Sequence, residues 1–327
     1  MRAAFDMIEG VIPMNKLIVA LMAVLLCMTM AFPATAEIYN IGICQLVQHD
    51  ALDEATQGFK DTLTELMGES VFFNEQNASG DTATCIAIIN AFLAEEVDLI
   101  LANATPSLQA AQSGTGDIPI LGTSITDYGA ALGIADWTGV TAQNVSGTSD
   151  LTPLDAHAAL LNEMFPDAKE VGLLYCSAEA NSQYQLETIE GYLKELGYSC
   201  TYYGFVDSND VASVTQTACQ NSDVLYVPTD NTVASCNEII RNVIEVENRA
   251  IIGGDEAICA SCGVATICID YYELGCATGQ MAYEILANGA DVSTMPVEFA
   301  PSYAKVYNPE LCEMLGVTAP DGYEPIG

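Results

Sequence analysis

Basic residues are scarce in this chain: 8 of its 327 residues are Lys or Arg, against 44 that are Asp or Glu. Nucleic acids and anionic membranes are bound through basic patches, so a formal net charge of -36 argues against both as partners. The acidic residues are scattered along the chain and form no runs. This pattern indicates a solvated surface that aids solubility, in preference to a specific cation site.

Familiar catalytic motifs are also absent. The sequence has no glycine-rich phosphate loop, no G-x-S-x-G elbow and no H-E-x-x-H motif. Its two histidines, His49 and His157, are far apart in the sequence and do not form a zinc-ligand pattern. Basic side chains hold phosphates, but of the six Lys and Arg residues after Glu37 all except Lys305 fall on helical patterns or at strand starts, away from the polar strand ends. We therefore expect no metal, no cofactor and no enzymatic activity, and a small polar ligand held by hydrogen bonds.

The amino end is typical of an export signal. A short positive region ends at Lys16, an apolar stretch follows, and small residues precede Glu37. The stretch is shorter than the about 20 residues that span a membrane. We expect residues 1–36 to be a signal segment cleaved after Ala36, with translation starting at Met14 and the protein exported to the periplasm or cell surface. Cys27 raises the alternative of a lipoprotein, but the large Leu26 before it disfavours a lipid-attachment site.

Cysteines are numerous for an exported protein. Without Cys27, 11 of the 12 cysteines remain, so at least one is free or intermolecular. Cys259 and Cys262 form a C-x-x-C motif, which leaves open an exported two-lobed enzyme or redox protein as the alternative function. A structural disulfide or buried thiols explain the motif as well, since no thioredoxin-like sequence surrounds it. Cys44 and Cys176 fall within strand patterns, where cysteine serves as a small core residue.

Beyond Glu37, apolar runs typical of strands alternate with runs of helical periodicity. Near Gly147 the alternation starts again, and a chain of this length favours two cores. The fold class that we expect is α/β, with two doubly wound lobes built on parallel sheets. Predicted strands cover residues 39–46, 70–76, 97–103, 118–124, 138–143, 170–176, 200–206, 223–228, 250–254 and 265–270. Predicted helices cover residues 51–66, 81–96, 105–112, 153–166, 181–197, 211–220, 232–248, 256–262 and 271–289, with Asp81 and Asp210 as N-caps.

Small polar residues follow directly after several of these strands. In open parallel sheets, ligands bind outside the carboxyl ends of the strands, so polar groups there on two lobes predict a cleft. Helix capping is the alternative explanation for each group taken alone. The groups are residues 45–50, 103–106, 123–127, 177–182, 229–232 and 254–256.

Several of these stretches resemble the exported substrate-binding proteins of ABC importers, in the group that includes tryptophan- and tyrosine-binding members. The resemblance rests on "IGICQLVQHDALDEATQGFKDTL", "LILANATPSLQAAQ", "GTSDLTPLDAHAALL", "YVPTDNTVAS", "GGDE" and "CIDYYELG", and it covers nearly all of residues 37–325. It implies a type I periplasmic-binding-protein fold with two lobes, three hinge crossings and capture of a ligand by closure. The sequence departs from the family at Cys176-Ser177-Ala178, where an Asn-Pro-Gly turn is usual.

The resemblance also implies limits for the lobes and a set of partners. The first lobe would hold residues 37–146 and 271–294, and the second residues 147–270 and 295–327, with crossings near Gly147, Asp270 and Met295. The expected partners are a small-molecule ligand and the permease subunits of the importer. We expect a monomer that binds no nucleic acid.

The resemblance places eight residues in cleft loops, and the strand ends add four more candidates. An aromatic amino acid is the expected ligand. Thr105 and Thr123, with nearby helix-start N–H groups, would bind its carboxylate, and Asp255 or Asp230 its ammonium group. The complete set of candidate ligand-binding residues is Gln45, His49, Thr105, Thr123, Thr126, Asp127, Glu179, Asn181, Ser182, Asp230, Asn231 and Asp255.

The stretch "YVPTDNT" bears on this set most directly. Pro228 ends the apolar run because it donates no N–H to a neighbouring strand. We expect Asp230 and Asn231 to face the cleft and to touch the ligand on closure. The alternative is that one of them caps the helix that begins near Thr232.

Overall fold

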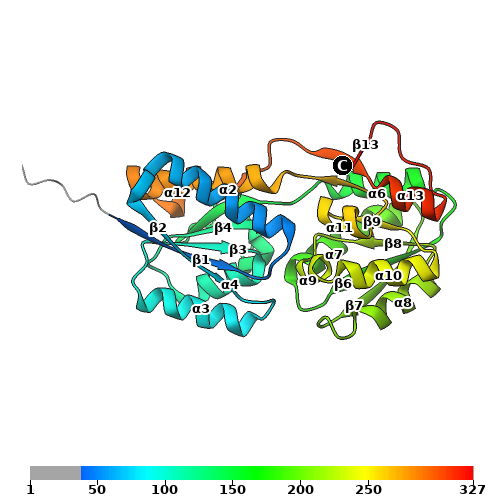
Figure 1. Ribbon diagram of the computed structural model, residues 1–327, viewed down its shortest axis with the longest axis horizontal. Coiled ribbons are helices and arrows are strands. Elements are labelled where there is room, and N and C mark those ends of the chain that lie inside the picture. Colours follow the sequence, from blue (N-terminus) through cyan, green and yellow to red (C-terminus); the bar gives the residue numbers. More distant parts are fainter. Residues whose placement is uncertain (1–37, 327) are drawn as a thin grey trace, which may run out of the picture. The chain divides into compact units, whose positions relative to one another are not determined.

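Two β-sheets carry the fold, and helices pack on both faces of each (Figure 1). The computed structural model describes residues 38–326, so the expected signal segment lies outside the described residues. The first sheet has the order β11-β5-β4-β3-β1-β2, and all of its strands are parallel. Its strands are β1 (Tyr39–Gln45), β2 (Val71–Asn77), β3 (Leu99–Asn103), β4 (Ile120–Ile125), β5 (Val145–Ser149) and β11 (Glu298–Phe299).

The second sheet has the order β13-β12-β10-β9-β8-β6-β7. Its strands are parallel except where β12 pairs with β10 in the antiparallel direction. They are β6 (Glu170–Cys176), β7 (Ser199–Phe205), β8 (Val224–Val227), β9 (Ile251–Gly253), β10 (Ala265–Cys268), β12 (Ala304–Tyr307) and β13 (Glu324–Pro325).

The helices fall between the strands in sequence, as the alternating pattern predicted. Residues 38–326 contain no helix of sufficient length and apolar character to cross a bilayer. The helices are α2 (Asp50–Met67), α3 (Thr82–Ala94), α4 (Thr105–Gly114), α5 (Tyr128–Leu132), α6 (Leu154–Met164), α7 (Ala180–Glu195), α8 (Val211–Asn221), α9 (Asn231–Ser235), α10 (Asn237–Glu247), α11 (Glu256–Ser261), α12 (Tyr271–Asn288) and α13 (Pro309–Leu315), with 3-10 turns η1 (Gly68–Ser70) and η2 (Val292–Thr294).

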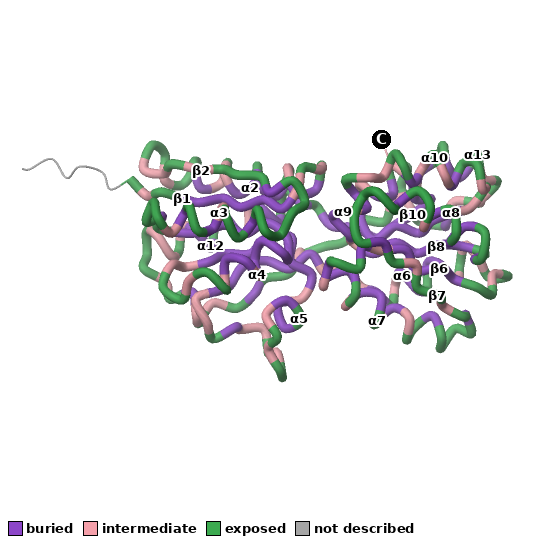
Figure 2. The backbone as a smooth tube through the Cα atoms, turned by 90° about the horizontal axis from the view of Figure 1, so that it is seen from below, coloured by how far each residue is buried: buried purple, intermediate pink, exposed green. Residues whose placement is uncertain are grey.

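Alternation of side chains along the strands builds a core on each face of a sheet. In β3, Leu99 and Leu101 pack with α2 and α12, whereas Ile100 and Ala102 pack with α3 and α4. The second sheet is covered in the same way, with α6, α7 and α13 on one face and α8 and α10 on the other. The central strands are therefore buried along their whole length (Figure 2). Such strands read as continuous apolar runs, which is why the sequence revealed them.

Helices α2 and α12 pack against each other at glycine positions. A Cβ atom on Gly58 would collide with the carbonyl oxygen of Tyr272, and one on Gly275 with that of Ala55. The two backbones therefore approach more closely than any larger residue would permit. This packing joins α12, near the end of the sequence, to a helix near its beginning (Figure 1).

Some predicted elements were wrong in position. A strand was expected within residues 138–143, but the strand of this region is β5, at Val145–Ser149. The single helix expected at 232–248 is two helices, because Cys236 leaves the helical conformation between α9 and α10. Asp210 occupies the N-cap position of α8 without a capping hydrogen bond, whereas Asp81 does cap α3. The short strands β11, β12 and β13 and helix α13 were not predicted from the sequence.

The pairings of two strands bear on the limits of the lobes. Residues 145–149 and 298–299 both pair within the first sheet, as β5 and β11. The chain therefore passes from the first sheet to the second after Ser149, and returns to the second sheet after Phe299. These points lie a few residues beyond the expected crossings at Gly147 and Met295, and the complete lobe limits remain a prediction.

Candidate functional site

The predicted site residues lie at or near the carboxyl ends of strands, in two groups. The first group follows β1, β3 and β4 of the first sheet, and the second follows β6, β8 and β9 of the second sheet. Nearly all of them are buried. Buried polar groups need hydrogen-bond partners, so the partners of each residue indicate whether it is free to meet a ligand.

The side-chain nitrogen and oxygen of Gln45 both form hydrogen bonds with residues of its own lobe. Its Nε2 atom donates to Asp53 Oδ1 at 2.6 Å and to the Val47 carbonyl at 3.0 Å, and its Oε1 atom accepts from Thr56 Oγ1 at 2.7 Å. Asp53 and Thr56 belong to α2. The Gln45 side chain therefore fixes α2 against the end of β1, which gives it a structural role.

The ends of β3 and β4 carry strained backbone. Ala104, at the N-cap of α4, has φ of 83°, and Ser124, within β4, has φ of 56°. Both values are uncommon for residues other than glycine, and such strain is often retained at functional sites. The Ser124 hydroxyl is buried without a hydrogen-bond partner. Thr123 accepts a hydrogen bond from Thr148 Oγ1 at 3.3 Å, and Thr105 begins α4, which has no side-chain cap.

Three of the predicted aspartates cap short helices. Asp127 accepts from the N–H of Ala130 at the start of α5, and Asp255 from that of Ile258 at the start of α11. Asp230 caps α9 through the N–H of Val233 at 2.9 Å. The capping alternative therefore accounts for one carboxylate oxygen of each residue.

The second oxygen of Asp230 is also occupied. Its Oδ2 atom accepts from the N–H of Cys176 and from Ser182 Oγ, both at 2.7 Å. Asp230 thus ties together the ends of β6, α7 and α9 and is 1% exposed. Its local partners engage both oxygens, which supports the capping role, and contact of Asp230 with a ligand remains a prediction.

Glu179 has a similar structural position. Its Oε2 atom accepts from the backbone N–H and the Nδ2 atom of Asn231, and its Oε1 atom from the N–H and hydroxyl of Thr232. Asn181 Nδ2 also donates to it, at 3.1 Å. The Asn181 Oδ1 atom, in contrast, is buried without a partner. Of these residues, Asn181 retains an unused acceptor.

Two predicted residues, one following a strand of the first sheet and one following a strand of the second, contact each other directly. His49 Nε2 lies 3.2 Å from Asn231 Oδ1. Burial lowers the pKa of His49, and its Nδ1 atom has no partner. Thr126, also predicted, uses its carbonyl to accept from Ser149 Oγ at 2.8 Å.

Two buried carboxylates lie near each other without a cation. Asp150 directly follows β5, and its Oδ2 atom accepts from the Tyr271 hydroxyl at 3.0 Å, whereas Oδ1 has no partner. Burial raises the pKa of Asp150 to about 6, and hydrogen bonds from Tyr271 and Thr126 oppose that rise. Burial raises the pKa of Asp255 to about 7, and the nearby charge of Asp150 adds to this rise. The capping hydrogen bond from the N–H of Ile258 acts in the opposite direction.

No basic side chain of residues 38–326 pairs with these two carboxylates. The ion pairs found there join Lys60 to Glu75, Lys194 to Glu190, and Arg241 to Glu245 and Glu310. A buried carboxylate normally has a cationic partner or becomes protonated. A cationic group of a ligand would therefore be attracted strongly to the buried carboxylates of Asp150 and Asp255. We call this pair, with Tyr271, the acidic site.

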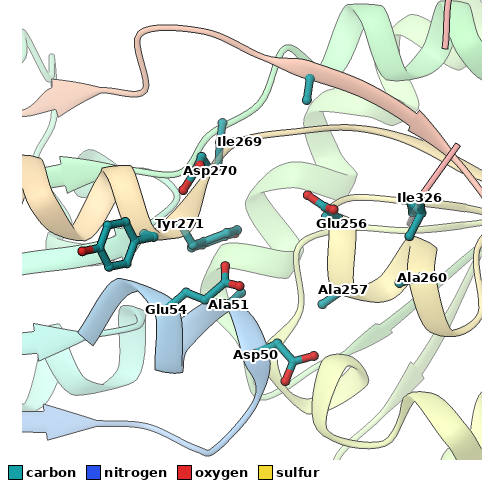
Figure 3. A pocket seen from close by; sticks show the side chains of 12 residues that line it. Asp50, Ala51, Glu54, Glu256, Ala257, Ala260, Ile269, Asp270, Tyr271 and Ile326 are labelled. Atoms are coloured by element: carbon teal, nitrogen blue, oxygen red, sulfur yellow. The ribbon is translucent and has the colours of Figure 1, made fainter. Parts of the chain in front are cut away.

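A cavity of about 630 Å³ adjoins the acidic site (Figure 3). Tyr271 lines it, and so does Glu256, the neighbour of Asp255. Most of its other lining residues come from α2, α11 and the segment that leads into α12, and they include the carboxylates of Asp50, Glu54 and Asp270 (Figure 3). Ala304 of β12 and Ile326 complete the lining. A second cavity, of about 200 Å³, is lined by Glu179 and by residues such as Leu46 and Pro106. Glu179 alone among the twelve predicted residues lines either cavity.

Sequence reasoning missed Asp150, Tyr271 and Ser124. Ser124 lies inside a polar group that the sequence did mark, and Asp150 ends "GTSD", directly after a strand. The position of Asp150 directly after a strand could therefore have identified it as a site residue. Within the described residues, no group of three or more His, Cys, Asp or Glu side chains is placed to hold a metal ion.

The C-x-x-C motif is buried in α11 and at its C-cap. Neither Cys259 nor Cys262 has exposed surface. Burial raises the pKa of Cys259 well above its usual value and that of Cys262 to about 12. Because the thiolate is the reactive form, this pair is unsuited to redox catalysis near neutral pH.

Comparison with known proteins gives three kinds of similarity. The family model described as ABC transporter substrate binding protein matches residues 40–323. A tyrosine-binding protein of Clostridioides difficile (strain R20291) is 37% identical over 261 residues, which is 79% of this chain and 75% of that protein.

Two solved structures extend these findings. An ABC domain in complex with L-Trp, from Streptococcus pneumonia, has a TM-score of 0.83 and 29% identity, covering 87% of this chain and 97% of that one. The ligand-free, open structure of a substrate-binding protein with adhesive properties from Clostridium difficile has a TM-score of 0.67 and 35% identity, covering 88% and 99%. The arrangement of residues 38–326 is thus more similar to the complex with L-Trp than to the open structure.

Proposed function

Because the chain belongs to the family of ABC transporter substrate-binding proteins, we propose that it captures an aromatic amino acid and delivers it to the permease of an importer. This membership confirms the family and the type I periplasmic-binding-protein fold that the sequence suggested. Members of the family are solute-binding proteins and not enzymes, they work with ABC permeases, and they are typically extracytoplasmic. Export of this chain through a signal cleaved after Ala36 is part of the proposal.

The observation that carries the amino-acid assignment is the acidic site. An α-ammonium group placed between Asp150 and Asp255 would supply the missing positive charge and fill the free Oδ1 position of Asp150. A neutral sugar lacks that charge, so it would leave two buried carboxylates uncompensated. The ammonium group of an amino acid therefore fits the site better than a sugar does.

A place for the ligand carboxylate lies at the neighbouring strand ends. Strands β5, β4 and β3 are adjacent in the first sheet, and neighbouring strands lie about 5 Å apart. Asp150, Ser124 and Thr105, which lie at or just after the ends of these strands, are therefore in neighbouring positions along the edge of the sheet. Helix α4 starts with Thr105 and has no side-chain cap, so its first N–H groups attract an anion. The unpaired Ser124 hydroxyl adds a donor. These groups would hold the carboxylate while the acidic site holds the ammonium group.

The aromatic character of the ligand rests on the relatives. One of them is named for tyrosine and another was solved with L-Trp. Capture would involve closure of the two lobes, in which the His49–Asn231 contact joins one lobe to the other.

Calorimetry with purified protein tests the proposal. We expect L-Tyr, L-Trp or L-Phe to bind with one-to-one stoichiometry, and the N-acetyl form of the same amino acid to bind at least about tenfold more weakly, because acetylation removes the positive charge. A sugar such as glucose serves as the control ligand and should not bind. Equal affinity for the acetylated and free forms would refute the role of the acidic site, and absence of binding by all twenty amino acids would refute the ligand class.

A further inference from the structure

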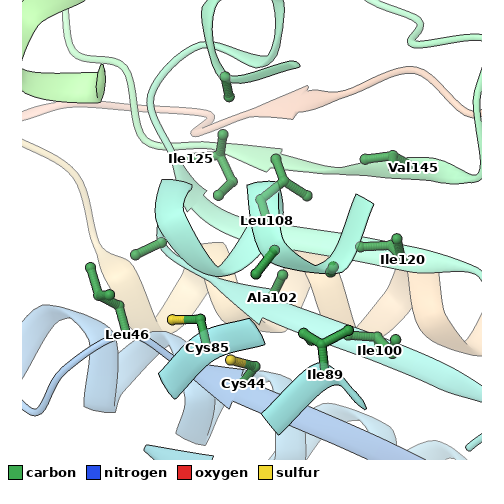
Figure 4. Close-up of a cluster of buried hydrophobic side chains, with 14 of the residues drawn as sticks. Cys44, Leu46, Cys85, Ile89, Ile100, Ala102, Leu108, Ile120, Ile125 and Val145 are labelled. Atoms are coloured by element: carbon green, nitrogen blue, oxygen red, sulfur yellow. The ribbon is translucent and has the colours of Figure 1, made fainter. Parts of the chain in front are cut away.

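Two cysteines that the proposed function does not use, Cys44 and Cys85, lie side by side in the buried core beneath α3 and α4 (Figure 4). Cys44 belongs to β1 and Cys85 to α3, and neither has exposed surface. Their Sγ atoms lie 3.7 Å and 3.6 Å, respectively, from the Oγ atom of Ser107 in α4. One hydroxyl group therefore brings together two thiols that are distant in the sequence.

The two thiols differ in acidity because they interact. Hydrogen bonding with Cys44 lowers the pKa of Cys85 to about 7, and the same contact, together with burial, raises the pKa of Cys44. A thiolate is the species that attacks a disulfide, and a second nearby thiol then resolves the mixed disulfide. The mutual effect on acidity shows that the two sulfur atoms lie close enough to interact, which a disulfide between them requires.

We propose that Cys44 and Cys85 form an intramolecular disulfide when the chain folds in an oxidising compartment. The oxidant is another disulfide, either a small molecule such as oxidised glutathione or a protein. The Cys85 thiolate attacks one of its sulfur atoms and displaces a thiolate, which leaves a mixed disulfide. That thiolate takes the proton of Cys44, and Cys44 attacks Cys85 Sγ and displaces the second thiolate. The second thiolate takes up the proton that Cys85 released when it ionised. The chain therefore loses two electrons and two protons, and the oxidant becomes two thiols.

Burial decides when this exchange takes place. Both sulfur atoms are inaccessible in the folded protein, so the oxidant reaches them before α3 closes over β1. The bond links β1 to α3 within the first lobe and closes a loop of about 40 residues. Both sulfur atoms lie in the core of the first sheet and line neither cavity, so we expect the bond to act on the stability of this lobe.

Mapping of thiols tests the proposal on the wild-type protein. The chain is unfolded in guanidinium with reductant, refolded with a mixture of reduced and oxidised glutathione, and then unfolded again with N-ethylmaleimide to block free thiols. Digestion without reductant and mass spectrometry should find the peptides of Cys44 and Cys85 joined, with two hydrogen atoms fewer than the separate peptides. Cys259 and Cys262 are the comparison pair and should carry N-ethylmaleimide, because Cys259 Sγ interacts with the Gly263 carbonyl and the two thiols share no bridging group.

A stability measurement gives a second readout. Wild type refolded with reductant should have a Tm on the order of 5 °C below that of wild type refolded under oxidising conditions, whereas the Cys44→Ala/Cys85→Ala variant should have the same Tm after both treatments. The Cys259→Ala/Cys262→Ala variant should respond as the wild type does. Recovery of both Cys44 and Cys85 with N-ethylmaleimide after oxidative refolding would overturn the proposal, whatever the variants do. Neither the thiol map nor the Tm comparison uses a ligand, so this result is independent of the proposed function.

Discussion

The Nε2 atom of His49 lies 3.2 Å from the Oδ1 atom of Asn231, which joins the start of α2 to the start of α9. Asn231 Nδ2 donates to Glu179, so its Oδ1 atom is the acceptor in this contact and His49 Nε2 carries the proton. Burial lowers the pKa of His49, which keeps the ring neutral near pH 7. Both residues were expected to bind ligand, which remains a prediction, and the structure places them in contact with each other.

Loss of this contact should weaken ligand binding. We expect His49→Ala to reduce amino-acid affinity about five- to tenfold, because a net hydrogen bond between the two lobes disappears. The free energy of unfolding should change little, since the contact joins two separate cores. Calorimetry and thermal melting measure the two effects, with Gln48→Ala, at the exposed neighbour, as the control. Unchanged affinity in the His49 variant would show that the contact contributes nothing to closure.

Ligand affinity should depend on pH through the acidic site. Asp150 and Asp255 have pKa values raised to about 6 and about 7, so both lose their negative charge as the pH falls through that range. An ammonium group needs the charged forms, and affinity should therefore rise between pH 5 and pH 8. Calorimetry at pH 5, 6, 7 and 8 tests this, and Asp150→Asn should flatten the dependence. Affinity that falls as the pH rises would contradict the assignment.

Asp150→Asn should stabilise the ligand-free protein while weakening binding. A carboxyl group whose pKa is raised on folding contributes stability below its unfolded pKa, and this contribution is lost as the pH rises through its folded pKa of about 6. At pH 8 the wild type therefore carries an unfavourable buried charge that asparagine lacks. We expect the variant to gain about 1 kcal/mol in free energy of unfolding at pH 8 and to bind at least about tenfold more weakly.

Chemical unfolding and calorimetry at pH 8 check both effects of Asp150→Asn. Asp117→Asn, at an exposed position far along the chain from the site, is the matched control and should change neither. A variant that is destabilised at pH 8 yet binds normally would assign Asp150 a purely structural role.

Asp230→Ala should affect folding and spare binding. The substitution leaves the donors of Cys176, Ser182 and Val233 without their acceptor, which should cost about 2–4 kcal/mol of folding stability. Asp210→Ala is a matched control, since Asp210 starts α8 without a capping hydrogen bond and should have little effect. A hundredfold loss of affinity with normal stability would restore the direct ligand contact that the sequence suggested.

The sequence predicted the alternation of strands and helices because buried parallel strands read as apolar runs. It also predicted which strand ends carry polar residues. It could not predict how those residues divide their hydrogen bonds. Asp230 and Asp255 look alike in sequence, yet both oxygens of Asp230 accept hydrogen bonds from its own lobe, whereas Asp255 lies near the charge of Asp150. Nor could it predict the burial of Asp150, which depends on a Tyr271 that is 121 residues away.

The glycine packing between α2 and α12 has a mechanical consequence. Because Gly58 and Gly275 press each backbone against the other, these helices cannot slide and must move as one rigid piece. The two helices begin at the same end of that piece, where His49 precedes α2 and Tyr271 starts α12, so one pair of helices holds both the interlobe contact and the acidic site. Any bending of the chain before α12 must therefore be absorbed by Ile269 and Asp270, in the short stretch between β10 and Tyr271. A substitution that stiffens this stretch, such as Ile269→Pro, would therefore affect the His49–Asn231 contact and the acidic site together.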